Sequence, residues 1–324
     1  MTTIVRLTLA ILALAAASGA AGADTYPSKP IRLIVPAPPA GPTDIVGRFL
    51  ADALRQSLGQ PVIVDNRVGG NGNVGAQAVA TAEPDGYTLL LGHQALNTLN
   101  PVLYRKLPFD LVGGLAPITT IASQANLLAV PAKSPHQTLA DVVGEARKRP
   151  GALNFGSTGI GTASHLLGEE LNRQAGVKVV HVPYKGQGQA VTALLAGEVD
   201  MMFASVPVAS PYLSAGTLRA IMVASPRRHR DLPAVPTSAE AGQPELLADV
   251  WFGLFAPAKT PPAIVDRLYK ETVAALRSGA LREALEKQKF EVRPSESPEA
   301  FAALVKREVE RWRQVVESAK VELD

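Results

Sequence analysis

Short apolar, β-branched runs alternate with segments of helical periodicity in the first part of the chain. The β-branched runs predict strands, and apolar residues three to four positions apart predict helices. The expected strands are 31–35, 62–64 and 88–91, and the expected helices are 43–58 and about 76–82. This alternation is typical of a parallel sheet covered by helices.

A second series of the same kind follows a proline-rich crossing at 127–131. Helices are expected at 139–148, 164–175 and 189–196, and strands at 153–156, 177–182, 199–204 and 218–224. Proline-rich loops then lead to a strand at 251–257 and to two amphipathic helices at 262–276 and 298–319. We interpret the second series as a separate α/β unit and the C-terminal helices as packing on the first one.

These patterns predict an α/β protein of two lobes, with a hinge and a ligand cleft between them. The first lobe is expected to comprise 24–123 and the returning segment 226–324, and the second lobe 124–225. Ligands commonly bind at such an interface, and the two crossings would allow the lobes to close around one.

The N-terminus carries the pattern of a secretory signal. Arg6 precedes the apolar run 7–17, and the small residues that follow end in an A-x-A pattern at Ala23. A membrane anchor is the alternative, but spanning a bilayer takes roughly 20 apolar residues and this run is shorter. We therefore expect 1–23 to be a signal peptide cleaved near Ala23, and the mature protein to lie in the periplasm.

Composition narrows the function further. The sequence has no cysteine, which excludes disulfides, thiolate metal sites and lipid attachment at an N-terminal cysteine. The 32 basic and 29 acidic residues are interspersed, so nothing indicates nucleic acid binding. The five histidines show no metal-ligand spacing, and we expect neither a metal nor a cofactor.

One glycine-rich segment, 70–75, matches the G-x-G-x-x-G pattern of dinucleotide-binding loops between an expected strand and an expected helix. However, it follows the second strand, and the turn 84–86 stands where a ribose-binding acid would be needed. An exported protein also rarely meets free NAD. The pattern therefore does not lead us to predict a cofactor site.

Two expected helix N-termini offer hydrogen-bond donors for an anion. In the first lobe, a proline-rich turn delivers Thr43 or Asp44 to the start of a helix, where free N–H groups and the helix dipole favour negative charge. In the second lobe, glycines let the backbone approach a ligand, and Ser157, Thr158 and Thr162 add hydroxyls. An ordinary N-cap or a tight turn would also explain each pattern. A facing pair of such ends suits a dicarboxylate or a similar anion.

A hydrolase is the enzymatic alternative, since cleft hydroxyls and His165 could pair for nucleophilic attack. The serine loop reads G-S-T-G-I-G instead of G-x-S-x-G, and no acid is placed by the sequence to orient His165. We expect a binding protein without catalytic residues. A receptor that reports ligand occupancy to a membrane sensor would have the same fold, and only its partner would distinguish it.

The segments that carry a family likeness are 26–31, 35–44, 66–75, 84–88, 107–110, 156–165, 181–186, 233–237 and 251–253. Taken together they resemble the Bug-type (TctC-like) receptors of tripartite tricarboxylate transporters, over essentially the whole mature chain. The resemblance implies a type II periplasmic-binding-protein fold, a ligand held largely by backbone amides and ordered water, and delivery to membrane transporter subunits. We expect a small organic carboxylate as the ligand and a monomer as the working form.

Carried over residue by residue, the resemblance implies ligand-binding residues on both lobes. In the first lobe they are Pro38, Pro39, Ala40, Gly41, Thr43, Asp44 and Gln94. In the second lobe they are Ser157, Thr158, Gly159, Gly161, Thr162, His165, Tyr184, Lys185, Gly186, Ala204 and Ser205. The chain departs from the family pattern at Ala37, at Ala40 with Gly41, and at Ala204. These changes open space and remove a partner for a ligand amine, which leads to the hypothesis of an unaminated, bulkier or aromatic carboxylate.

Overall fold

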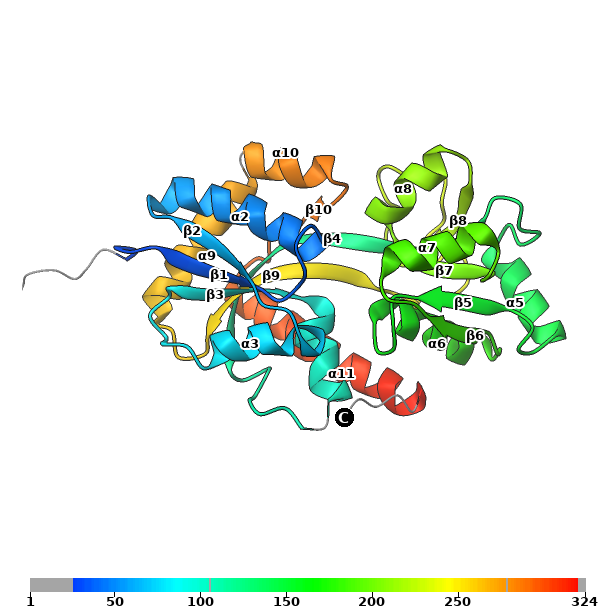
Figure 1. Cartoon of the computed structure of the whole chain (residues 1–324), viewed down its shortest axis with the longest axis horizontal. Coiled ribbons are helices and arrows are strands. Elements are labelled where there is room, and N and C mark those ends of the chain that lie inside the picture. The colour runs from blue at the N-terminus through cyan, green and yellow to red at the C-terminus, as the bar shows by residue number, and fades with distance from the viewer. Residues whose placement is uncertain (1–25, 105, 278, 320–324) are drawn as a thin grey trace, which may run out of the picture.

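Alternating apolar strands and amphipathic helices build two α/β lobes, which lie side by side in Figure 1 and are joined by two long strands. The computed structural model describes residues 26–319 apart from 105 and 278, so the expected signal peptide 1–23 lies outside the described residues. Within this part of the chain, no helix combines the length and the apolar character needed to cross a membrane.

The first lobe is built on three parallel strands. β1 (Ile31–Val35) pairs with β2 (Val62–Asn66) and with β3 (Thr88–His93), and β9 (Asp249–Pro257) adds antiparallel to β3. The helices of this lobe are α2 (Pro42–Leu58), α3 (Asn73–Ala80), α9 (Pro262–Arg277), α10 (Ala280–Lys287) and α11 (Pro298–Ala319).

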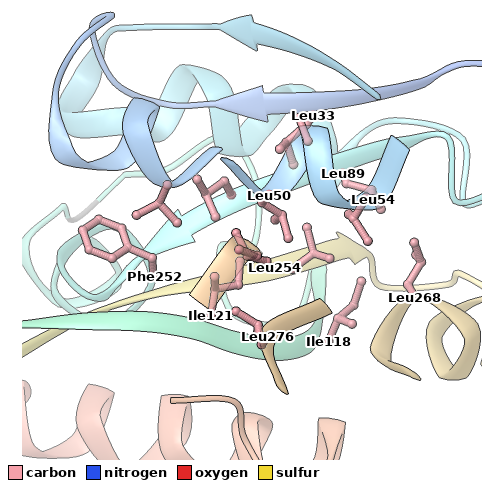
Figure 2. Close-up of a cluster of buried hydrophobic side chains, with 14 of the residues drawn as sticks. Leu33, Leu50, Leu54, Leu89, Ile118, Ile121, Phe252, Leu254, Leu268 and Leu276 are labelled. Carbon is pink, nitrogen blue, oxygen red and sulfur yellow. The ribbon is translucent and has the colours of Figure 1, made fainter. Parts of the chain in front are cut away.

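Each face of this sheet has its own core, because successive side chains of a strand point to opposite faces. Leu33 of β1 belongs to a cluster with Leu50 of α2 and Leu268 of α9, which Figure 2 shows. Its neighbour Ile34 belongs to a second cluster with Phe301 of α11. Burying each of these side chains contributes about 1.5–3 kcal/mol. The two layers together hold the strand ends of this lobe in place.

The second lobe repeats the plan around β5 (Asn154–Ser157), which pairs in parallel with β6 (Val180–Pro183) and β7 (Met201–Ser205). β8 (Leu218–Val223) lies antiparallel to the long strand that enters from the first lobe. The helices of this lobe are α5 (Leu139–Lys148), α6 (Ala163–Ala175), α7 (Gln187–Ala196) and α8 (Val206–Ser214).

The long strand β4 (Leu115–Pro131) is shared by both lobes. Its first part pairs with β9 as far as Ala125, and its last part pairs with β7 and β8 from Asn126 onward. The expectation of parallel pairing is correct for β1–β3 and for β5–β7, but the crossing strands are antiparallel. The chain leaves the first lobe on β4 and returns on β9, so the two crossings run in opposite directions.

The segment between β8 and β9 packs on the second lobe. Leu246 and Ala248 belong to the same buried cluster as Phe155 of β5, and Thr237 forms a bridge with Val223 of β8. The lobe boundaries stay a prediction, and these contacts favour a return at β9 over the expected return at 226.

Several elements have no counterpart among the expected ones. The π-helix η2 (Ala95–Leu99) and the short helix α4 (Asn100–Leu103) follow β3 directly. The proline-containing α8 and the short α10 were likewise not expected, and a 3-10 turn η1 (Gly70–Gly72) precedes α3. A π-helix often occurs at functional sites, and η2 begins where the cleft between the lobes lies.

Candidate functional site

The cleft between the two lobes has a volume of about 420 Å³ and is reached by strand ends from both. Its lining residues are Pro36, Ala37, Pro38, Val68, Gly69, Asn71, Gly72, His93, Ala95, Asn100, Gln124, Asn126, Thr158, Gly161, Thr162, Ala163, Ser164, Gln187 and Val250. A larger hollow of about 560 Å³ lies between α2, α9 and α10, but residues of the first lobe alone line it. Ligands of α/β proteins bind at the carboxyl ends of parallel strands, which favours the cleft as the binding site.

The polar side chains in the described lining of the cleft are uncharged. Its described lining contains no lysine, arginine, aspartate or glutamate. Burial lowers the pKa of His93 to about 4, so this side chain is neutral at pH 7. His93 Nδ1 accepts a hydrogen bond from Leu96 N at 3.3 Å, which leaves Nε2 to carry the proton and donate. Any charge on a ligand must therefore be balanced by dipoles and hydrogen bonds.

One such dipole is that of α6, whose N-terminal residues Ala163 and Ser164 line the cleft. Gly159 and Gly161, at φ 129° and φ 75°, allow the tight loop before it. In this loop, Gly161 N donates to His165 Nδ1 at 3.1 Å, and Thr162 Oγ1 donates to Gly159 O at 2.7 Å. Among the described contacts, the N–H groups of Ala163 and Ser164 have no protein acceptor. Two donors in the first turn of α6 are thus free for an anion.

Two stacked histidines stand behind this loop. The rings of His165 and His181 lie 3.8 Å apart, and His181 also stacks on Phe155. Burial lowers the pKa of His165 to about 4, and the neighbouring His181 lowers it further in the same direction. Burial also lowers the pKa of His181. Both rings are therefore neutral at pH 7 and serve as hydrogen-bond partners and packing groups.

Ser157 forms a hydrogen bond of 2.6 Å with His181 Nε2, which is the kind of pair a hydrolase would use. However, Ser157 is completely buried, and its Oγ accepts from Gly159 N at 3.1 Å. Among the described ion pairs, the acid that pairs with His165 is Glu169, whose Oε1 lies 3.9 Å from His165 Nε2. The pair therefore supports the loop and presents no accessible nucleophile to the cleft.

The N-terminus of α2 in the first lobe is already occupied by an anion of the protein itself. Asp44 accepts hydrogen bonds from Ala40 N at 2.9 Å, Arg48 Nε at 2.8 Å and Asn66 Nδ2 at 2.9 Å. Burial alone would raise the pKa of Asp44, but the hydrogen bonds from Arg48, Ala40 and Asn66 outweigh it and hold the pKa below its ordinary value. Asp44 is therefore ionised and places a negative charge of the protein itself in the first turn of α2, although none of its described donors is an N–H group of that turn.

Four of the residues expected from the sequence line the cleft: Pro38, Thr158, Gly161 and Thr162. The remaining expected residues, which do not line it, are Pro39, Ala40, Gly41, Thr43, Asp44, Gln94, Ser157, Gly159, His165, Tyr184, Lys185, Gly186, Ala204 and Ser205. Some of these support lining residues. Ser205 Oγ donates to Gln187 Oε1 at 2.9 Å, and His165 Nδ1 accepts from Gly161 N at 3.1 Å. Lys185 is exposed at the surface.

Several lining residues were not expected. The segment that matched the dinucleotide pattern contributes Asn71 and Gly72, and Gly69 just before it also lines the cleft. These residues shape a site, although not one that we predict for a dinucleotide. Gln124 and Asn126 come from β4. The signal for these two was a pair of amides two positions apart, directly before the apolar run 127–130.

Comparison with known proteins identifies the family. The family model described as "Tripartite tricarboxylate transporter family receptor" matches residues 46–321. The chain belongs to this family. The resemblance and the two-lobe fold expected from the sequence are both confirmed, and the relatives are solute-binding receptors.

Two sequence relatives match along nearly their whole length. BugT of Bordetella pertussis is 35% identical over 313 residues, which cover 96% of each chain. A UPF0065 protein from the tcbD-tcbE intergenic region of Pseudomonas sp. is 38% identical over 294 residues. The match covers 90% of the present chain and 87% of the relative.

Solved structures of related receptors share the fold. A Rhodopseudomonas palustris protein with adipate is 33% identical with a TM-score of 0.81, covering 92% of the receptor and 99% of that chain. MatC from the same organism, with bound malate, is 33% identical with a TM-score of 0.77, covering 90% of the receptor and 100% of MatC. Each of these two neighbours thus carries a small carboxylate.

Proposed function

We propose that this receptor binds a small organic carboxylate in the cleft between its lobes and delivers it to the membrane subunits of a tripartite tricarboxylate transporter. The observation that carries the proposal is the open N-terminus of α6, where the N–H groups of Ala163 and Ser164 have no acceptor among the described residues and the described cleft lining carries no charged side chain. The adipate and malate bound to the two related structures support the same ligand class.

The carboxylate is proposed to accept hydrogen bonds from Ala163 N and Ser164 N, with the Thr158 and Thr162 hydroxyls beside them. Hydrogen bonds to a charged group contribute about 1.5–3 kcal/mol each, and the helix dipole adds about 0.3–1 kcal/mol. No lysine or arginine is required, which agrees with the exposed position of Lys185. In this proposal, some of the other expected site residues support the loops of the cleft. For the rest, a direct contact with the ligand stays a prediction.

The receptor is further proposed to be exported to the periplasm, with its signal peptide cleaved near Ala23, and to work as a monomer. These statements are supported by the N-terminal sequence pattern and by the periplasmic binding proteins among its relatives.

A thermal-shift screen of the mature protein tests the ligand class. The panel contains mono-, di- and tricarboxylates, aromatic acids and the amides of each. Ligand at a hundredfold excess over its dissociation constant stabilises the folded state by about 2.7 kcal/mol. We expect a carboxylate to raise the melting temperature while its amide does not, because the amide carries no charge for the α6 N-terminus. A hit that binds equally well as acid and as amide would contradict the proposal.

A further inference from the structure

The last helix, α11, makes contacts with both lobes. Its first half packs in the first lobe, where Phe301 and Val305 are buried in one cluster with Ile34 of β1. Its second half leaves that cluster and reaches α6 of the second lobe (Figure 1). α11 is therefore a connection between the lobes in addition to the two crossing strands.

Apolar side chains form the first part of this connection. Trp312 and Val316 of α11 are buried in one cluster with Leu166 of α6, and Leu99 and Leu103 of the first lobe complete it. Trp312 is 1% exposed and Leu166 is 0% exposed. Because residues of both lobes bury these side chains, separating the lobes at this point would expose apolar surface to water, which is unfavourable.

Arg311 adds a polar contact beside Trp312. Its Nη2 donates to Glu245 O at 3.2 Å and to Leu247 O at 2.6 Å. Leu246, which stands between these two residues, is buried in the core of the second lobe. The guanidinium thus binds a firmly packed part of that lobe, and hydrogen bonds from a charged donor are stronger than those between neutral groups.

On the side of α10, the contacts between the lobes are of a weaker kind. Arg230 Nη1 lies 3.2 Å from Glu286 Oε2, and Lys289 Nζ lies 3.0 Å from Asp231 Oδ2. Arg230 Nη2 also donates to Glu286 O at 3.1 Å. The four side chains are 30–47% exposed, and ion pairs between solvated groups contribute little to stability. The buried contacts of α11 are therefore expected to dominate.

We propose that Arg311, Trp312 and Val316 form a latch that holds the two lobes in the arrangement of this structure. Two crossing strands alone would act as a hinge about which the lobes can turn. Leu166, which the latch holds, lies in the first turn of α6, at the wall of the cleft. The latch thus positions this wall, although none of its three residues lines the cleft. This inference goes beyond the proposed function and does not depend on which ligand binds.

Spin labels on the two lobes test the latch without any ligand. The sequence has no cysteine, so Ser57→Cys on α2 and Ala196→Cys on α7 give one label site on each lobe, both at exposed positions. Double electron–electron resonance then measures the separation of the labels. With the latch intact, we expect one dominant distance.

Arg311→Met keeps an apolar stem and removes both hydrogen bonds to the second lobe. It should shift the balance between latched and released lobes about tenfold to hundredfold toward the released form, which adds a second distance to the distribution. The double variant Arg311→Met with Val316→Ala also removes apolar contact and should populate that distance further. A distribution that is the same in both variants as with the intact latch would overturn the inference.

Arg313→Met is the matched control. Arg313 is exposed, and its described ion pair is with Glu310 of α11 itself. This variant removes the same charge from the same helix and should keep the wild-type distance. Thermal transitions followed by circular dichroism establish that each variant is folded. A second distance in Arg313→Met equal to that in Arg311→Met would contradict the latch, because it would trace the effect to α11 as a whole.

Calorimetry with the carboxylate that gives the largest shift in the thermal screen provides a second readout. The apparent affinity should fall in proportion to the fraction of molecules that stay latched, and an affinity that does not follow this fraction would contradict the link between latch and cleft. If no carboxylate binds the wild type, the proposed function fails while the label distances still decide on the latch. If a carboxylate binds and the distances do not respond to the variants, the latch alone fails.

Discussion

Each lobe lines the cleft with a proline- or glycine-rich loop that leads into a helix N-terminus, but the two helix ends differ. In the first lobe, Asp44 sits in the first turn of α2 and accepts three hydrogen bonds from its surroundings. In the second lobe, the first turn of α6 has no acidic residue, and hydroxyls and His165 stabilise the loop. One end therefore contains its own anion, and the other is left open for a ligand.

This difference shows why a motif at a helix start does not by itself identify a binding site. The helix dipole favours an anion at either end. Whether a ligand supplies that anion depends on the side chains already present. Asp44 makes α2 a structural support of the cleft, whereas the neutral α6 end is its proposed anion site.

The largest expected effect comes from filling the open end. Thr162→Asp places a carboxylate at the N-cap of α6, where its oxygens can accept hydrogen bonds from the free N–H groups that a ligand would otherwise use. Two like charges 4 Å apart repel by about 4 kcal/mol at an effective dielectric constant of 20. Carboxylate affinity, measured by calorimetry, should therefore fall by more than about a hundredfold.

The matched control is Thr162→Asn, which has the shape and capping ability of aspartate without its charge. It should bind the carboxylate far more tightly than Thr162→Asp does, and both variants should keep a cooperative thermal transition. Similar affinities of the two variants would show that shape, and not charge, governs this end of the cleft.

A smaller effect is expected from acid, which protonates buried histidines in both lobes, among them His93 and His165. The unfolded chain has a histidine pKa of about 6.5, whereas burial lowers that of folded His165 to about 4. The contribution of neutral His165 to the free energy of unfolding is therefore fully present above about pH 6.5. It is lost as the pH falls toward 4, and about 2 kcal/mol of it is lost at pH 5. Asp44, whose pKa is held below its ordinary value, stays ionised at pH 5.

Urea unfolding at pH 7 and pH 5 measures this effect. In His165→Asn the amide oxygen can replace Nδ1 as the acceptor for Gly161 N without titrating, so this variant should lose less stability than the wild type between the two pH values. His136→Asn, outside the cleft, should behave like the wild type. An identical loss in all three proteins would remove His165 as the cause.

Much of the fold could be predicted from the sequence, because local periodicity reports it. The helix at 139–148 and the strand at 31–35 both have the bounds expected from the sequence. The proline-containing α8 and the π-helix η2 were missed, since prolines and a five-residue segment hide the helical period. The reach of β4 across both lobes was also missed, because it depends on pairing with β9, which is distant in the chain.

The cleft could be predicted only in part, for a similar reason. Glycine- and hydroxyl-rich loops drew attention to Thr158, Gly161 and Thr162, all of which line it. Gln124 was missed because the sequence does not tell which face of β4 meets the cleft, and that is set by strand pairing between the lobes. The hydrogen bond from Asn66 to Asp44 was missed because Asn66 lies 22 residues away in the sequence.

The most direct test of the carboxylate site is a calorimetric titration of Ala163→Pro with the best carboxylate from the screen and with its amide. Proline is well tolerated at the first position of a helix, and Thr162 before it is already extended, at φ −82° and ψ 161°. The substitution thus removes one N–H donor that has no described protein acceptor, whereas the control Ala163→Ser keeps it. The account predicts that Ala163→Pro weakens carboxylate binding by about tenfold to hundredfold, with a normal melting temperature without ligand. Wild-type affinity for the carboxylate in Ala163→Pro would contradict it.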